Sequence, residues 1–258
     1  MPILQFKIFV LTIIICYSIL CVAVYIGQRK LLYFPQTGIE LADATPITFS
    51  SASLTLSGWI INPGQSRALL YYGGNAEQVE FNSEFFRTVL PNYSVYLVPY
   101  RGYGGNAGVP TEKALYQDAL SIYDTLANQH DTFVVMGRSL GSGVATYVAA
   151  ERQVEKVILV TPFDSIEKVA GSLYWMFPVK YLLKDRFASI ERMSKIDVPI
   201  LILIAENDRV IPYNHTENLI HAISPAILTT SLVAGANHNN ISNQFAYSNA
   251  IDQFLLVE

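Results

Sequence analysis

The chain has 258 residues, of which 51% are hydrophobic and 15% are charged, a length that suits a single α/β domain. Its formal net charge of -4 gives no sign of a nucleic-acid-binding surface, so we expect no nucleic acid among its partners. Cys16 and Cys21 both lie in an apolar segment and make neither a metal-ligand set nor a disulfide framework. We therefore expect no metal and no cofactor, and the low charge predicts a large core, a membrane segment, or both.

The first apolar segment runs from Ile8 to Ile26 without a charged residue, which is long enough to cross a bilayer as a helix. A cleaved signal peptide is disfavoured, because its apolar region would be shorter and would end in a small-x-small cleavage site. We predict that residues 1–30 form an uncleaved single-pass membrane anchor, in the inner or plasma membrane if the source is a bacterium. Lys7 and the α-amino group on one side balance Arg29 and Lys30 on the other, so the orientation stays open.

The rest of the chain, residues 31–258, is expected to form one domain. Short apolar runs predict strands at 47–49, 54–61, 68–72, 95–98, 132–136, 157–160, 200–204 and 228–233. Helices are predicted between them at 77–90, 111–128, 141–151, 213–223 and 242–257. The first two strands are expected to pair antiparallel. The alternation that follows predicts an α/β domain with a mostly parallel sheet and helices on both faces.

A G-x-S-x-G sequence lies between an apolar strand and a helical run of small residues, with Ser139 flanked by Gly137 and Gly141. In such a strand-to-helix turn the serine backbone is strained, and side chains two positions away would collide with the turn. The helix that follows places its N-terminal N–H groups near the serine. We predict a nucleophile elbow with Ser139 as the nucleophile, and an ordinary glycine-rich loop is the alternative.

A serine hydroxyl is a weak nucleophile and needs a base, with an acid to orient that base. Around this motif the acid and then the histidine follow the serine along the chain. His238 lies in a loop directly after the last predicted strand, so we expect it to be the base. For His130, which precedes the serine, we expect a surface position. His215 and His221 share one predicted helix and are expected to be a solvated or packing pair.

The acid is expected after the strand at 200–204, where Asp208 stands. Glu206 is its nearest rival. Asp164, which follows the preceding strand, is a second rival, although its position also suits a helix cap. We predict Asp208 as the acid, against the alternative of a turn or cap aspartate.

A charged tetrahedral intermediate also needs hydrogen-bond donors. The backbone N–H of Leu140, directly after the serine, is expected to be one donor. The second is expected from the loop after the strand at 68–72, where Gly74 is the best candidate. A plain turn is the alternative for this loop.

With these residues placed, the chain from Leu31 onward resembles the α/β-hydrolase superfamily. It is most similar to a membrane-anchored subgroup that includes bacterial hydrolases and eukaryotic protein depalmitoylases. The shared segments are Tyr33-Phe34-Pro35, Gly58-Trp59, Tyr72-Gly73-Gly74-Asn75-Ala76, Tyr100-Arg101-Gly102-Tyr103-Gly104, Gly137-Arg138-Ser139-Leu140-Gly141, Asn207-Asp208-Arg209-Val210-Ile211-Pro212 and Gly235-Ala236-Asn237-His238-Asn239. The resemblance implies the α/β-hydrolase fold, with Ser139 as nucleophile, Asp208 as acid and His238 as base. One departure is Tyr72, where the family usually has a histidine that organises the loop.

Residues 172–192 interrupt the alternation with a strongly apolar stretch. In the family this region forms a small cap near the active site, which would favour an apolar acyl group; packing on the sheet edge is the alternative. We predict a serine hydrolase of carboxylic esters or thioesters that acts on a small-molecule or acyl-chain substrate. A serine peptidase and a non-catalytic, membrane-anchored binding or scaffold protein are the alternatives. The first 30 residues are expected to serve localisation and to contribute nothing to catalysis.

Overall fold

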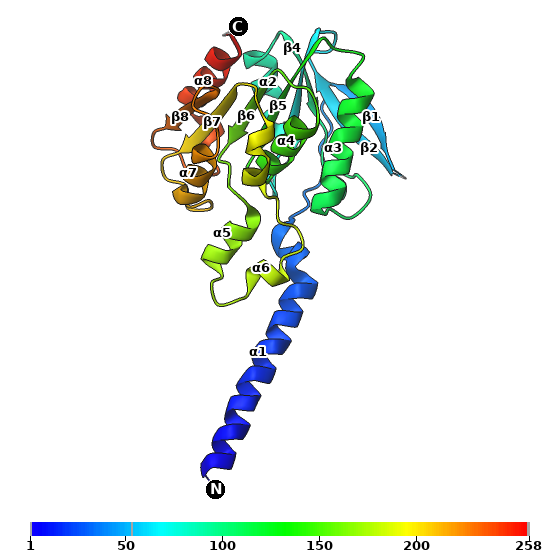
Figure 1. Ribbon diagram of the computed structural model, residues 1–258. Coiled ribbons are helices and arrows are strands. Elements are labelled where there is room, and N and C mark those ends of the chain that lie inside the picture. Colours follow the sequence, from blue (N-terminus) through cyan, green and yellow to red (C-terminus); the bar gives the residue numbers. More distant parts are fainter. Residues whose placement is uncertain (1, 53, 257–258) are drawn as a thin grey trace.

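In the computed structural model, which describes residues 2–52 and 54–256, a long N-terminal helix extends away from an α/β domain (Figure 1). Within these residues eight strands form one sheet in the order β1-β2-β4-β3-β5-β6-β7-β8. The strands are β1 (Thr45–Ser51), β2 (Leu54–Ile61), β3 (Arg67–Tyr72), β4 (Tyr93–Leu97), β5 (Thr132–Arg138), β6 (Lys156–Val160), β7 (Ile200–Ala205) and β8 (Leu228–Val233). Each predicted strand is therefore present at its predicted place.

The helices connect these strands. They are α1 (Pro2–Leu32), α2 (Ser83–Val89), α3 (Glu112–Leu126), α4 (Leu140–Glu151), α5 (Ile166–Leu173), α6 (Val179–Leu182), α7 (Tyr213–His221) and α8 (Phe245–Leu256). Within the described residues the short 3-10 helices are η1 (Val79–Asn82), η2 (Ser189–Lys195) and η3 (Ile241–Asn243). The prediction of one helix over residues 77–90 is thus wrong at its start, because Glu77 and the residues around it form a turn ahead of η1.

The sheet is parallel except at β2, which pairs antiparallel with both β1 and β4. Consecutive strand residues point to opposite faces, and Leu69 and Leu70 accordingly join two different core clusters. Leu115 of α3 packs in the cluster on one face and Phe86 of α2 in the cluster on the other. The predicted α/β architecture, a mostly parallel sheet covered on both faces, is confirmed.

The strand order reverses at β3, because β4 lies on one side of it and β5 on the other. Right-handed crossovers then place α2 and α3 on opposite faces, which opens a crevice beyond the carboxyl ends of β3 and β5. The loop at 73–75 follows β3, and Ser139 follows β5. Both segments that the sequence predicts for catalysis therefore come to the same edge of the sheet.

The helix α1 is longer than the expected span of 8–26, since it continues without a break to Leu32. No proline interrupts it before Pro35, and the expected domain boundary after residue 30 falls inside its last turn. Among the described residues, α1 is the helix that is long and apolar enough to cross a membrane, and most of its side chains are exposed. Its role as an anchor stays a prediction.

The last turns of α1 are fixed to the domain by polar contacts with residues 182–185. The Gln28 side chain is 8% exposed; it donates from Nε2 to Leu182 O (2.9 Å) and accepts at Oε1 from Lys184 N (2.7 Å). Arg29 Nε donates to Asp185 Oδ2 at 2.9 Å. A buried amide with both ends paired resists rotation of the helix, so one particular face of α1 is held toward the domain.

We expect the full chain to stay in the membrane fraction through an alkaline carbonate wash, because α1 in water would expose 17 large apolar side chains. A chain lacking residues 1–30 should pass into the wash. Release of the full chain by carbonate would contradict the anchor.

Candidate active site

Ser139 lies on the turn from β5 to α4, and its backbone has the strain expected of a nucleophile elbow, with φ 49° and ψ -118°. A Cβ at Gly137 would lie 2.2 Å from Gly141 O, and one at Gly141 would lie 2.0 Å from Tyr72 O. No side chain fits at such distances, so both glycines are required by close packing. The collision expected from the sequence is confirmed. The Ser139 side chain is thereby held above the N-terminus of α4.

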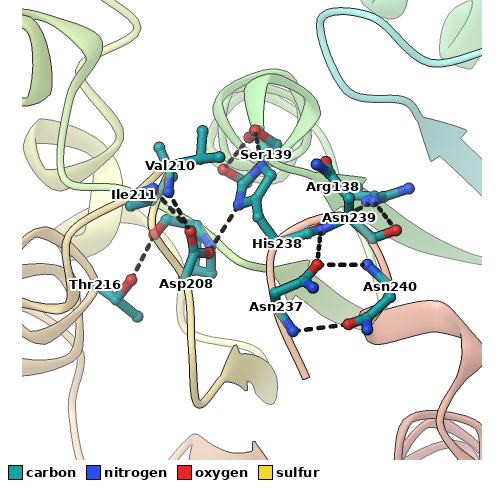
Figure 2. A network of polar contacts seen from close by, with 12 residues as sticks. Arg138, Ser139, Asp208, Val210, Ile211, Thr216, Asn237, His238, Asn239 and Asn240 are labelled. Carbon is teal, nitrogen blue, oxygen red and sulfur yellow. Dashed lines mark hydrogen bonds and ion pairs between the residues drawn. The ribbon is translucent and has the colours of Figure 1, made fainter. Parts of the chain in front are cut away.

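The structure brings Ser139, His238 and Asp208 together in one chain of hydrogen bonds (Figure 2). His238 Nε2 lies 3.0 Å from Ser139 Oγ, and His238 Nδ1 lies 2.7 Å from Asp208 Oδ2. Because a carboxylate only accepts hydrogen bonds, Nδ1 carries the hydrogen and the Nε2 lone pair faces the serine hydroxyl. This arrangement can remove a proton from Ser139.

Asp208 is oriented by its own loop. Its Oδ1 accepts hydrogen bonds from the backbone N–H groups of Val210 (2.8 Å) and Ile211 (2.9 Å), as Figure 2 shows. These two bonds leave Oδ2 directed at His238. The rival Glu206 is exposed and accepts a hydrogen bond from Gly235 N instead.

Asp164, the second rival, is fully buried and belongs to a different histidine. Its Oδ1 lies 3.0 Å from His215 Nδ1 and accepts from Ser165 N, while its Oδ2 accepts from Asn218 Nδ2. His215 Nε2 lies 3.0 Å from Ser172 Oγ. The chain therefore contains a second serine, histidine and aspartate in hydrogen-bonded order, which the sequence did not predict.

The two arrangements differ in the electrostatics of their helices. Ser139 precedes α4, whose first N–H groups lack helical partners, whereas Ser172 lies in the last turn of α5 and donates to Val169 O at 2.8 Å. A helix N-terminus stabilises negative charge and a C-terminus destabilises it. An oxyanion is therefore favoured beside Ser139 and disfavoured beside Ser172.

The other histidines lie away from Ser139. His130 contacts Tyr96 Oη (2.7 Å) and Gln65 O (2.9 Å) and is half-buried. His221 is exposed at the end of α7, while His215 is buried. The two histidines thus differ, since His221 is solvated while His215 is packed against partners from α5 and from the loop after β6.

The loop after β3 is held by residues to which the sequence assigned no role. Tyr100 Oη donates to Gly73 O (2.9 Å), and Tyr103 Oη donates to Asn75 O (2.7 Å). Both tyrosines belong to the shared segment at 100–104. The Tyr72 hydroxyl is buried and has no hydrogen-bond partner among the described residues. Tyr100 and Tyr103, rather than Tyr72, therefore organise this loop.

Gly74 N donates to Glu77 Oε2 at 2.7 Å. The N–H that is predicted to stabilise the oxyanion is therefore already hydrogen-bonded to this carboxylate. The role of Gly74 stays a prediction, as does that of Leu140 at the start of α4. Asn75 lines the same two cavities as Ser139, and its backbone N–H makes no hydrogen bond within the described part of the chain. It is a further candidate for the second donor.

Glu77 and Arg138 tie the site loops together and were not singled out by the sequence. Glu77 also accepts from Tyr71 Oη (2.7 Å), and Arg138 Nη1 lies 3.5 Å from Glu77 Oε1. Arg138 Nη2 donates to the backbone carbonyls of His238 (3.0 Å) and Asn239 (3.3 Å). Burial, and then the Glu77 carboxylate, raise the pKa of Tyr71 well above its usual range, so its hydroxyl stays a donor.

No sequence signal distinguishes these two residues. A glutamate shortly after a glycine loop also suits the first turn of a helix, and Arg138 occupies the variable position of G-x-S-x-G. Their link connects the loop after β3, the elbow and the histidine loop.

Ser139 lies between two cavities of different polarity. One, of about 500 Å³, is mainly apolar and is lined by α1, α5, α6 and the segment between the last two. The other, of about 370 Å³, is lined by polar side chains that include Glu77, Arg138 and His238. Such a pair can hold an apolar group on one side of the serine and a polar group on the other. Among the described residues no group of three or more His, Cys, Asp or Glu side chains is placed to hold a metal.

The apolar stretch at 172–192 divides between the two expected roles. Leu173, Phe177 and Leu182 line the apolar cavity beside Ser139, as a cap would. Phe187 is fully buried in the main core, as sheet-edge packing would require. The cap stays a prediction; the residues of this region that line the cavity run from Ile166 to Leu183, and we call residues 166–183 the cap below.

The amino-acid sequence is similar to those of several known proteins. The chain is 31% identical over 228 residues to an uncharacterized protein of Mycobacterium tuberculosis, covering 83% of this chain and 81% of that protein. It is 29% identical over 205 residues to the human alpha/beta hydrolase domain-containing protein 17B, covering 76% of this chain and 69% of that protein. No family model matches.

Solved structures share the fold. An esterase of Pyrococcus furiosus superposes with a TM-score of 0.69 at 15% identity, covering 87% of this chain and 96% of that one. An alpha-beta hydrolase from Vibrio vulnificus has a TM-score of 0.63 at 20% identity, covering 83% of this chain and 79% of that one. At these identities the likeness concerns the fold.

Asp164→Asn should lower the stability of the protein, because it weakens a buried network in which each hydrogen bond to the charged group contributes about 1.5–3 kcal/mol. We expect the thermal midpoint to fall by several degrees, measured by scanning fluorimetry in detergent. Glu206→Gln, at an exposed carboxylate, is the matched control and should leave the midpoint unchanged. Equal midpoints for both variants would show that the Asp164 network does not stabilise the fold.

Proposed function

The chain belongs to the α/β-hydrolase superfamily, and on that premise we propose that it is a membrane-anchored serine hydrolase that cleaves carboxylic ester or thioester bonds. The observation that carries the proposal is the hydrogen-bonded order Asp208, His238, Ser139 on a strained strand-to-helix turn. The exposed apolar helix α1 supports the anchor, with Arg29 and Lys30 at the end that meets the domain.

In the proposed reaction, Ser139 Oγ attacks the acyl carbonyl carbon while His238 Nε2 takes the hydroxyl proton. Asp208 holds the imidazole and stabilises its charge. The oxyanion that forms receives hydrogen bonds from Leu140 N and from the loop at 73–75, either from Asn75 N or from Gly74 N after it leaves Glu77 Oε2.

The tetrahedral intermediate then collapses. The bond between the carbonyl carbon and the alcohol oxygen or thiol sulfur breaks, and His238 gives its proton to the leaving group. A water molecule next attacks the acyl-enzyme, His238 takes a proton from that water, and the carboxylic acid leaves as Ser139 recovers its proton.

The two cavities support ester or thioester chemistry. The apolar cavity beside Ser139 suits an acyl group, and the polar cavity that contains Arg138 suits a leaving group with hydrogen-bonding atoms. The fold is shared with an esterase of Pyrococcus furiosus, which is consistent with this class of substrate.

Ser139→Ala should abolish covalent labelling by a fluorophosphonate and lower ester turnover by several orders of magnitude, because the attacking oxygen is lost. The matched control is Ser172→Ala, which removes the other serine that contacts a histidine. It should leave labelling and turnover near wild type. Labelling that survives in Ser139→Ala and disappears in Ser172→Ala would assign the nucleophile to α5 instead.

Asp208→Asn should lower kcat by about 10⁴, because an amide in place of the carboxylate favours the wrong histidine tautomer. Asp164→Asn and Glu206→Gln, assayed on the folded fraction, should keep kcat within a few-fold of wild type. The assay is release of p-nitrophenol from a short ester. If Asp164→Asn is the crippling change, the acid has been assigned to the wrong strand.

A further inference from the structure

The apolar cavity beside Ser139 has one wall made by α1. Val24, Gln28 and Leu31 line it, together with Leu32, and their spacing puts them on one face of the helix. Ile166, Val169 and Leu173 with Ala170 form a similar stripe on α5 at the opposite wall. Two helical faces thus enclose a space that ends at Ser139 and Leu140.

The contacts that hold this wall are specific. Gln28 is paired at both ends of its amide with residues 182–184, and Arg29 is paired with Asp185. Lys184 Nζ also lies 3.9 Å from the centre of the Tyr25 ring. These contacts fix both the rotation and the depth of α1 relative to the cap, so Val24 stays directed at the cavity.

The cap lies along α1 for several turns on the N-terminal side of Arg29 and Lys30. Tyr17 Oη donates to Met176 O at 2.6 Å, and the Tyr17 and Phe177 rings stack with centroids 6.3 Å apart. Tyr17 precedes Arg29 by 12 residues, which is about 18 Å along the helix. A hydrocarbon core is about 30 Å thick. With Arg29 at the membrane surface, the tip of the cap reaches the hydrocarbon region.

The exposed side chains of the cap agree with that depth. Trp175 is 79% exposed and Tyr181 is 81% exposed, and Leu173, Tyr174 and Met176 are about half exposed. So many exposed large apolar side chains in one short segment are unusual on a protein in water and favour a membrane or partner surface. Figure 1 shows α5 and α6 beside α1, on the side of the sheet from which α1 leaves the domain.

We propose that α1 and the cap form a lateral entrance through which a long acyl chain passes from the bilayer leaflet to Ser139. The substrate is an ester or thioester whose long acyl chain is held in that leaflet, and Val24, Gln28 and Leu31 determine specificity for this chain. The inference rests on the proposed hydrolase function and adds the substrate class and its route.

The physical reason is the continuity of apolar surface. An acyl chain that reached Ser139 through water would lose favourable burial at every methylene. A chain that slides between α1 and α5 moves from hydrocarbon into an apolar cavity. The polar part of the substrate then meets the polar cavity on the other side of Ser139. The expectation that residues 1–30 serve localisation alone holds, under this proposal, only for short soluble esters.

The first test uses the full chain in phosphatidylcholine vesicles. Val24→Trp fills the cavity, and we expect kcat/KM for a peptide with an S-hexadecanoyl chain in the vesicle to fall by about tenfold or more. Hydrolysis of p-nitrophenyl acetate should fall much less than that of the long-chain substrate, since a short acyl group does not reach α1. Ile26→Trp, at a position that is 73% exposed, is the matched control and should change neither rate. The proposal is overturned if both variants behave alike, or if the two substrates lose activity together.

The second test keeps the wild-type sequence. The full chain in vesicles is first labelled at Ser139 with a long-chain alkyl fluorophosphonate that carries a diazirine near the end of its alkyl chain. The labelled protein is then irradiated, and the crosslinked residues are mapped by mass spectrometry. We expect crosslinks to residues 24–32 and 166–183. Crosslinks to residues of the polar cavity, such as Phe81 or Ser242, would contradict the proposed entrance for the acyl chain. Absence of any attachment to Ser139 would instead contradict the proposed hydrolase function.

A comparison of two substrates then identifies the molecule that supplies the acyl chain. Vesicles carry either the S-acylated peptide or a phospholipid ester as the substrate. Cleavage of one of these, sensitive to Val24→Trp and not to Ile26→Trp, supports the entrance and names its source. Cleavage of neither, while p-nitrophenyl acetate is still hydrolysed, would overturn the proposed substrate class and leave the serine hydrolase intact.

Discussion

The turn at Ser139 is the constraint on which the rest of the site depends. A residue other than glycine at φ 49° carries a strain of about 1–3 kcal/mol. Neighbouring structure holds it, since Ser139 N donates to Val160 O in the next strand and Ser139 O accepts from Ser142 N in α4. The close approach of Gly141 to Tyr72 O keeps α4 tight against the sheet. The strain is therefore distributed over two strands and a helix, and it directs one hydroxyl outward.

The surrounding loops are brought to that hydroxyl by the order of the strands and then locked by charge. Because β3, β5 and β8 run parallel, the three loops that follow them lie at one edge of the sheet, and the reversal at β3 opens a crevice between the first two. Glu77 and Arg138 connect them, because the carboxylate binds the loop after β3 and the guanidinium binds the histidine loop. The site is thus a set of backbone segments held at fixed distances by one partly buried ion pair.

The comparison of Ser139 with Ser172 separates residue type from environment. Each serine contacts a histidine that contacts an aspartate. Only Ser139 stands at a helix N-terminus, where free N–H groups favour a developing negative charge. Only Ser139 also borders both an apolar and a polar cavity. The reactivity expected of a serine in this fold therefore depends on the surrounding backbone as much as on the three side chains.

Local patterns in the sequence were sufficient for the elements and for naming three candidate site residues that the structure brings together. Apolar runs of strand length predicted every strand, and the G-x-S-x-G spacing predicted the strained turn, because strand burial and turn sterics are set by neighbouring residues. Order along the chain put Asp208 after β7 and His238 after β8, as the sequence predicts. Within the described residues, these predictions needed no contact between distant parts of the chain.

Only the tertiary structure decided which distant side chains meet. Glu77 looked like the start of a helix, and it turns toward Gly74 and Arg138 because the packing of three loops gives it better partners there. Asp164 and Asp208 were both reasonable acids by position, and the fold assigned a different histidine to each. Val24 and Gln28 read only as parts of an apolar helix. They line the cavity because the contacts of α1 with residues 182–185 set its rotation, and no local pattern encodes a rotation that depends on residues more than 150 positions away.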